Sequence, residues 1–198
     1  MVGDMTRIVA GRAGGRRIAV PRAGTRPTSE RVREALFSRL AHDGVLDGAR
    51  VLDLCAGSGA LGLEAASRGA AEVVLVDSAR QATRVCESNA RSLALDGVRT
   101  VTARAESFLA GAAAAPCDLV LLDPPYDLGE ADLAGLLRLL ARRQDPWLAD
   151  TGVVVVERSA RSPEPEWPDG LVRVATRRYG ETALWFAEPG DGAVGPPD

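Results

Sequence analysis

Strand-like and helix-like segments alternate along the chain from Arg50 onward, and this order limits the possible folds more than any other feature. Short apolar runs typical of buried strands occupy residues 51–54, 72–76, 98–102, 119–122 and 153–156. Helical patterns occupy residues 60–67 and 78–95, followed by a stripe of Leu133, Leu136, Leu137 and Leu140 that we assign to the core. Strands that alternate with helices predict an α/β protein whose parallel sheet is covered on both faces.

Hairpin patterns flank this alternating region at both ends. Near the N-terminus, residues 7–10 and 16–20 are typical of two short strands around a glycine-rich turn. Near the C-terminus, residues 171–176 and 182–186 predict an antiparallel hairpin. The sequence therefore predicts a seven-stranded, mostly parallel sheet with a C-terminal antiparallel hairpin, plus a small N-terminal β-hairpin.

These patterns divide the chain into three regions. Residues 1–27 form a basic hairpin and connector, residues 28–187 form the main domain, and residues 188–198 are predicted to be a disordered tail. The main domain begins with a helix that Thr28 or Ser29 can cap.

Positive charge is concentrated at the N-terminal end. Residues 1–39 contain nine arginines and three acidic residues, a net charge of +6. Because the whole chain carries −3, the remainder carries −9. A basic arm on an acidic body predicts an anionic partner that is met at one end of the molecule.

Several classes of protein are disfavoured by composition. No apolar run approaches the roughly 18 residues of a membrane span, and the N-terminus does not resemble a secretory signal. The three cysteines, Cys55, Cys86 and Cys117, are widely separated and odd in number, which favours reduced thiols and a cytoplasmic location. With His42 as the single histidine, we expect no metal site.

A glycine-rich loop follows the first strand of the alternating region. Gly57, Gly59 and Gly62 let the backbone turn sharply and approach a ligand at the edge of an open α/β sheet. Asp77 ends the next strand, 20 residues after Gly57, where a carboxylate can accept hydrogen bonds from both ribose hydroxyls. The spacing is compatible with a nicotinamide dinucleotide and equally with S-adenosylmethionine.

Asp53, just before the glycine loop, favours S-adenosylmethionine because a carboxylate there attracts a cationic methionine group and repels a pyrophosphate. The arrangement Asp-x-x-x-Gly-x-Gly resembles the class I, Rossmann-like methyltransferases. The resemblance implies that the backbone of Ala105 contacts the adenine, and it leaves open whether Arg104 or Glu106 adds a side-chain contact. The predicted cofactor-binding residues are Asp53, Ala56, Gly57, Ser58, Gly59, Asp77, Ser78 and Ala105.

The tetrapeptide Asp123-Pro124-Pro125-Tyr126 follows the apolar strand 119–122. Two prolines stiffen the turn and remove two backbone donors, so we expect outward, unpaired carbonyls beside an acidic and an aromatic side chain. The tetrapeptide alone could be a rigid surface turn. After a cofactor loop, it resembles the catalytic motif of the amino-methyltransferases, which act on adenine N6, cytosine N4, guanine N2 or a glutamine side chain. We therefore assign all four residues to the catalytic site.

Together, these segments make the chain resemble the bacterial 16S rRNA guanine-N2 methyltransferases of the guanine-966 type. The segments that carry the resemblance are residues 7–11, 26–37, 53–59, 123–126, 156–159 and 179–182. The resemblance implies S-adenosylmethionine-dependent methylation of a guanine N2 amine in a 16S rRNA hairpin loop, within an assembling 30S particle. We expect the enzyme to be a monomer. The predicted RNA-binding residues are Arg7, Arg12, Arg16, Arg17, Arg26, Arg31 and Arg33.

Other functions remain open at this point. The tetrapeptide alone also suits a methyltransferase that acts on DNA adenine or cytosine, or on a protein glutamine. The glycine loop alone also suits a nicotinamide oxidoreductase, and the basic arm alone suits a non-catalytic RNA-binding module.

Overall fold

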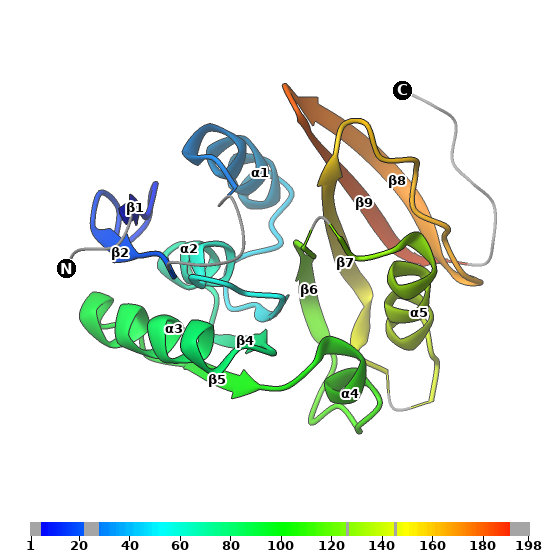
Figure 1. Ribbon diagram of the computed structural model, residues 1–198, viewed down its shortest axis with the longest axis horizontal. Coiled ribbons are helices and arrows are strands. Elements are labelled where there is room, and N and C mark those ends of the chain that lie inside the picture. The colour runs from blue at the N-terminus through cyan, green and yellow to red at the C-terminus, as the bar shows by residue number, and fades with distance from the viewer. Residues whose placement is uncertain (1–4, 22–27, 126, 145, 191–198) are drawn as a thin grey trace.

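The structure is a computed structural model that describes residues 5–21, 28–125, 127–144 and 146–190 of the 198. Two residues of the predicted sites, Arg26 and Tyr126, lie outside the described residues. Within the described part, one seven-stranded sheet has the strand order β5-β4-β3-β6-β7-β9-β8, and β1 pairs with β2 in a separate two-stranded sheet (Figure 1). The predicted fold class is confirmed.

The elements follow the predicted order. The strands are β1 (Met5–Arg7), β2 (Arg17–Ala19), β3 (Arg50–Leu54), β4 (Glu72–Asp77), β5 (Val98–Thr102), β6 (Cys117–Leu122), β7 (Leu148–Ser159), β8 (Gly170–Tyr179) and β9 (Thr182–Gly190). The helices are α1 (Glu30–His42), α2 (Ala60–Ser67), α3 (Arg80–Leu93), α4 (Ala105–Leu109) and α5 (Glu130–Leu140). Ser29 caps α1 by accepting a hydrogen bond from the Val32 amide, as its position before the helix predicts.

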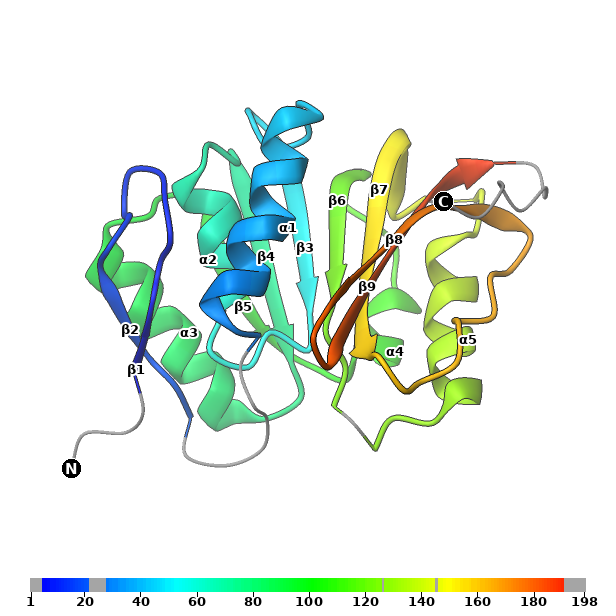
Figure 2. The same ribbon diagram turned by 90° about the horizontal axis from the view of Figure 1, so that it is seen from above.

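Helices cover both faces of the large sheet. One apolar core joins α1, α2 and α3 to the sheet, and the second joins α4 and α5 to the opposite face (Figure 2). The predicted leucine stripe of α5 is buried in the second core, which confirms its structural assignment. A parallel sheet buried on both faces explains why its central strands are almost continuously apolar.

Strand direction gathers the motifs at one edge of the sheet. Strands β3, β4, β5, β6 and β7 pair in parallel, so their carboxyl ends lie together. The glycine loop follows β3, Asp77 ends β4 and Asp123 follows β6, so all three reach this edge. β9 is antiparallel to β7 and pairs Thr182 with Ser159, which brings the turn between β8 and β9 to the same edge.

Two details differ from the sequence predictions. Residues 188–190 were expected in a disordered tail but belong to β9, because their backbone pairs with residues 170–172 of β8. Residues 191–198 of that tail lie outside the described residues. The short helix α4 was not predicted, because five residues are too few to display a helical period.

The N-terminal hairpin packs firmly on the main domain. Ile8 and Ile18 are fully buried in the first core, and the buried carboxylate of Glu64 on α2 accepts hydrogen bonds from the Val9 and Ala10 amides at 2.7 and 3.0 Å. Gly11 passes so close to α2 that a Cβ there would lie 2.0 Å from the Ser67 carbonyl oxygen. The hairpin is therefore part of the folded body as well as a carrier of charge.

Arg33 was predicted to contact RNA, and the structure corrects this assignment. Its side chain is 0% exposed on α1, and Nη2 donates to the Thr6 hydroxyl and to the Arg7 carbonyl oxygen. Burial lowers the pKa of the Arg33 guanidinium from its ordinary value, and nearby glutamates oppose that shift. A buried guanidinium cannot reach a phosphate, so Arg33 anchors the hairpin.

Replacing Glu64 with glutamine is expected to lower the free energy of unfolding by about 2–3 kcal/mol. The amide keeps a single acceptor oxygen, so its NH₂ group faces a donor from which Glu64 now accepts, and the variant also loses the charge that pairs with Arg68 at 2.7 Å. Urea denaturation measures the difference. Glu87→Gln is the matched control, because its ion pair with Arg91 is exposed and contributes less than about 1 kcal/mol. Equal stability of the two variants would contradict this account of the hairpin.

Candidate active site

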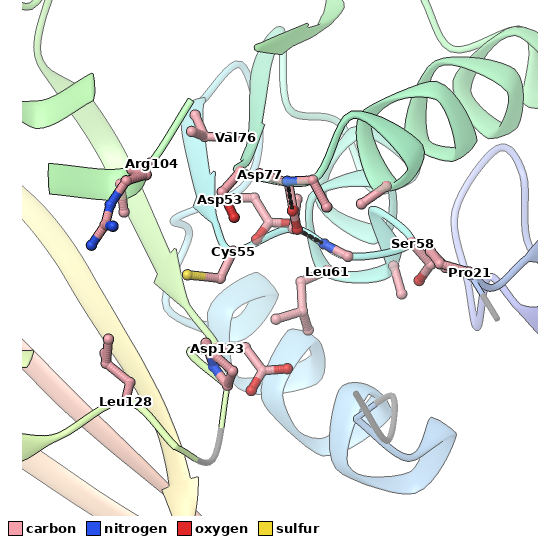
Figure 3. A pocket seen from close by; sticks show the side chains of 18 of the residues that line it. Pro21, Asp53, Cys55, Ser58, Leu61, Val76, Asp77, Arg104, Asp123 and Leu128 are labelled. Carbon is pink, nitrogen blue, oxygen red and sulfur yellow. Dashed lines mark hydrogen bonds between the residues drawn. The ribbon is translucent and has the colours of Figure 1, made fainter. Parts of the chain in front are cut away.

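A cavity of about 540 Å³ opens at the carboxyl edge of the parallel strands. Its walls come from the glycine loop, the ends of β4 and β6, the loop before α4, and the chain after β2. Figure 3 shows Asp53 and Asp77 close together on one side of the cavity and Asp123 across from them. Three carboxylates around one cavity make it electronegative.

Asp53 is the most deeply buried of these carboxylates, at 1% exposure. Its Oδ2 accepts a hydrogen bond from the Gly62 amide at 2.8 Å, and its Oδ1 has no hydrogen-bond partner within the described residues. Burial, together with the charges of Asp123 and Asp77, raises the pKa of Asp53 to about 8, although the Gly62 amide opposes the shift. A buried acceptor without a donor favours a cationic or N–H-bearing ligand.

The glycines of the loop have different structural roles. Gly57 lines the cavity with φ +56° and donates its amide to Asp77 at 2.9 Å. Gly59, with φ +79°, starts α2 and faces the core instead of the cavity. At Gly62 a Cβ would lie 2.3 Å from Leu75, so this glycine allows α2 to pack against β4 and to bring its amide to Asp53.

The remaining predicted cofactor residues also come together. Ala56, Ser58, Asp77, Ser78 and Ala105 line the cavity. The second carboxylate oxygen of Asp77 accepts a hydrogen bond from the Ala79 amide at 2.8 Å, which fixes the orientation of the side chain. Arg104 and Glu106 lie on the same wall, with 3.5 Å between the Arg104 Nε and a Glu106 oxygen.

The tetrapeptide turn begins directly after β6, where Asp123 lines the cavity. The prediction that both proline carbonyls are unpaired is wrong for Pro125, whose carbonyl oxygen accepts a hydrogen bond from the Leu128 amide at 3.0 Å. Pro124 is buried, and its carbonyl is the candidate acceptor that remains. Burial raises the pKa of Asp123 to about 6, and a hydrogen bond from Thr28 opposes the shift.

Two further polar residues lie at this point, and the sequence analysis did not assign them to the site. The Thr28 hydroxyl contacts the Asp123 carboxylate at 3.1 Å and the Glu157 carboxylate at 2.8 Å. Thr28 had been considered only as a helix cap, and Glu157 only as part of a family segment. The signal for Glu157 was its position directly after the apolar run 153–156, which parallels the position of Asp123 after its own strand.

The predicted RNA-binding arginines are in different environments. Arg12, Arg17 and Arg31 are exposed. Arg7 is exposed and pairs with Glu30 at 2.7 Å. Arg16 is exposed as well, but its guanidinium donates to the Ser92 and Leu93 carbonyl oxygens at the end of α3. The Arg16 guanidinium therefore already interacts with the negative end of the α3 dipole, and it is less available to a phosphate than a free arginine is.

The hairpin also contributes to the cavity. Val20 and Pro21, which follow β2, line one wall (Figure 3 labels Pro21). Asn89 on α3 exchanges hydrogen bonds with the Ala19 backbone and donates to the Ser58 carbonyl of the glycine loop, each at 2.9 Å. The Asn89 side chain thus connects the end of the hairpin to the candidate cofactor loop through hydrogen bonds.

No helix in the described ranges is long and apolar enough to cross a membrane. Among the same residues, no group of three or more His, Cys, Asp or Glu side chains is placed to hold a metal ion.

The sheet order, the glycine loop after β3 and the Asp-Pro-Pro turn after β6 define the class of protein: a class I methyltransferase. The chain belongs to the family described as Conserved hypothetical protein 95, whose model matches residues 6–188.

Known proteins of this kind resemble the chain over most of its length. It is 40% identical to "Ribosomal RNA small subunit methyltransferase D" of Escherichia coli (strain K12) over 163 residues, 82% of this chain and 79% of the relative. A solved Escherichia coli structure, described provisionally as the methyltransferase yhhF, aligns with a TM-score of 0.81 and 35% identity over 96% of this chain and 100% of the other. Magnesium protoporphyrin IX methyltransferase of Synechocystis PCC 6803, solved with bound SAM, shares the fold with a TM-score of 0.63 and 16% identity. The alignment covers 81% of this chain and 79% of the other.

Proposed function

We propose that this protein transfers a methyl group from S-adenosylmethionine to the exocyclic N2 amine of a guanine in a 16S rRNA hairpin loop. The observation that carries the proposal is the cavity, in which the buried Asp53 carboxylate lies on the side opposite Asp123 of the Asp-Pro-Pro turn. The name of the Escherichia coli relative supports rRNA of the small subunit as the substrate.

The residues present fit S-adenosylmethionine better than a dinucleotide. The unpartnered Oδ1 of Asp53 suits the cationic methionine portion, and the Asp77 carboxylate suits ribose hydroxyls. A pyrophosphate in the same cavity would be repelled by Asp53, Asp77 and Asp123. Ala105 lines the cavity, which supports the proposal that its backbone contacts the adenine, and the side-chain contribution of Arg104 or Glu106 is left to experiment.

The chemistry that S-adenosylmethionine supplies is an electrophilic methyl group on a sulfonium, whose C–S bond breaks as the new N–C bond forms. Asp123 and the Pro124 carbonyl accept hydrogen bonds from the amine and direct its lone pair toward that methyl group. The methylated nitrogen then loses one proton, which the ionised Asp123 carboxylate or water accepts. Tyr126, outside the described residues, is proposed to stack on the target base.

No strong base is needed in this scheme, because the amine becomes acidic only once it carries the methyl group. Asp123 acts by position and by charge. Since its pKa is raised to about 6, the carboxylate is ionised at neutral pH, and the rate should fall as the pH drops below about 6.

The arm is proposed to bind phosphates. We expect the double variant Arg12→Gln, Arg17→Gln to weaken RNA binding and to reduce the slope of log K against log[salt] by about 1.4, because each lost phosphate contact on single-stranded RNA removes about 0.7. Binding titrations at several salt concentrations measure the slope. Deletion of residues 1–22 is a poorer test, because it would also remove the buried Ile8 and Ile18.

The matched control is Arg99→Gln with Arg138→Gln, two exposed arginines. Arg99 lies near the amino end of β5 and Arg138 in the last turn of α5, away from the cavity edge. An unchanged slope in the arm variant, or an equal change in this control, would mean that the arm is structural only.

The substrate class is tested by supplying labelled S-adenosylmethionine with naked DNA, a protein that presents a glutamine substrate, or 30S particles that lack the modification. The proposal predicts label in the RNA of the particles alone. Label in DNA or in the protein would assign the chain to one of the other amino-methyltransferase groups. A second incubation with the particle's free rRNA shows whether the enzyme, proposed to be a cytoplasmic monomer, requires an assembled particle.

A further inference from the structure

Glu157 lies in β7, two residues before that strand ends, beside Asp123, which directly follows the adjacent strand β6. β6 and β7 pair in parallel with Leu122 opposite Val156, so Asp123 and Glu157 are the next pair in the same register. Residues in equal register on parallel strands point to the same face of the sheet. Both carboxylates therefore project toward Thr28, which precedes α1 on that face.

Among the described residues, the Thr28 hydroxyl is the one side-chain donor in contact with both carboxylates of this pair. The Thr28 hydroxyl has one proton, yet it lies within hydrogen-bond distance of both carboxylates, at 3.1 Å from Asp123 and 2.8 Å from Glu157. Two neighbouring carboxylates with one shared donor have spare acceptor positions, which water, an additional proton or the N–H groups of a ligand can fill.

Burial and the charge of Asp123 raise the pKa of Glu157 to about 8, while Thr28 and the Arg33 guanidinium of α1 oppose the shift. Glu157 therefore holds a proton at neutral pH in the ligand-free protein and must lose it before it can accept a hydrogen bond from a base. Glu157 is nevertheless partly exposed. Because Glu157 shares the Thr28 hydroxyl with Asp123, which lines the cavity, a base held by Asp123 would also lie next to Glu157.

The possible amine substrates differ in the atom next to the amine. Guanine has N1–H beside its N2 amine, so it offers two adjacent donors. Adenine has the acceptor N1 beside N6, cytosine has the acceptor N3 beside N4, and a glutamine amide has its carbonyl oxygen beside the nitrogen. A pair of carboxylates matches guanine and leaves the other three groups with an acceptor facing an acceptor.

We propose that Glu157 is the residue that selects guanine, by accepting a hydrogen bond from N1–H while Asp123 accepts one from the N2 amine. Thr28 holds the two carboxylates together. The inference rests on the proposed function and adds to it a determinant of the nucleobase, which the Asp-Pro-Pro turn does not provide.

The test uses RNA or reconstituted particles with three different bases at the target position. Guanine is the reference, and 2-aminopurine keeps the 2-amine but has an unprotonated N1. 6-Thioguanine keeps N1–H and the 2-amine but lacks O6, so it controls for loss of that oxygen. Above pH 8, where Glu157 is ionised, the wild-type enzyme is expected to methylate 2-aminopurine at least about tenfold less efficiently in kcat/KM than guanine, and 6-thioguanine nearly as well as guanine.

The variant Glu157→Gln sharpens the test, because its amide can donate to the unprotonated N1 of 2-aminopurine. We expect the preference for guanine over 2-aminopurine to fall by about tenfold or more, mainly through gain on 2-aminopurine, because the glutamine oxygen can still accept from guanine N1–H. Glu188→Gln, on the exposed far end of β9, is the matched control and should keep the wild-type ratio.

Equal methylation of guanine and 2-aminopurine by the wild-type enzyme would overturn the proposal, and this comparison needs no variant to fold. A Glu157→Gln enzyme that loses the same factor on both bases would also overturn it, since that is the behaviour of a purely structural residue. If the wild-type enzyme methylates no guanine-containing RNA and labels another substrate class, the proposed function itself fails, which is a distinguishable result.

Discussion

Asp123→Ala is expected to reduce kcat for methyl transfer by a factor on the order of 100 to 1,000, while S-adenosylmethionine still binds. The alanine removes an acceptor that orients the target amine, and losses of this size are typical when one fixed polar group is removed from a reacting centre. The side chain lies across the cavity from Asp53 and Asp77, which are proposed to hold the cofactor (Figure 3). Single-turnover kinetics and calorimetric titration with the cofactor measure the two effects separately.

Asp123→Asn is the control that distinguishes an acceptor from a base. The asparagine oxygen can still accept a hydrogen bond from the amine, so this variant should keep much more activity than the alanine variant. It should also lose the decline in rate below about pH 6, because it no longer has the carboxyl whose pKa is raised to that value. Cofactor binding lost in parallel with activity would contradict the assigned role of Asp123.

Asp53→Asn is expected to weaken S-adenosylmethionine binding by roughly 10- to 100-fold, the range for loss of a hydrogen bond to a charged group. The asparagine is nearly isosteric and its oxygen can still accept from the Gly62 amide, so the glycine loop should stay folded. Calorimetric titration measures the affinity. Asp96→Asn, at an exposed position, is the matched control and should bind as the wild type does.

The same interaction should make cofactor affinity depend on pH. Because the pKa of Asp53 is raised to about 8 in the cofactor-free protein, the carboxyl is largely protonated at pH 6 and must lose its proton to pair with a cation. Affinity should therefore rise from pH 6 to pH 8 with release of up to one proton, and Asp53→Asn should flatten this rise. A wild-type affinity independent of pH would contradict a charged contact at Asp53.

Features that depend on local sequence could be predicted well. The alternation of apolar runs gave the sheet and both hairpins, and the cofactor loop follows its strand as expected because glycines and strand ends are local signals. The register between neighbouring strands does not depend on local sequence. Asp123 and Glu157 are 34 residues apart, so nothing in the sequence shows that they lie side by side. The pairing of β6 with β7 is also irregular between Cys117 and Leu119, so the two strands cannot be aligned by counting from their first residues.

Burial of charged side chains could not be predicted from the sequence either, and it explains the wrong assignment of Arg33 to RNA binding. Arg33 lies on a helix among exposed arginines, and its partners, Thr6 and the Arg7 carbonyl, are more than 25 residues away. Glu64 is buried for a similar reason, since the backbone amides that it accepts from belong to the hairpin. A charge count along the sequence cannot distinguish such anchors from residues that meet phosphate.

The most direct test of the account is nucleoside analysis of 16S rRNA after incubation of 30S particles from a strain that lacks this protein with the purified enzyme and S-adenosylmethionine. The account predicts one new N2-methylguanosine, mapped to a hairpin-loop guanine, and none with Asp123→Ala. Methylation of adenine, cytosine or a ribosomal protein, or no transfer to the particle at all, would contradict it.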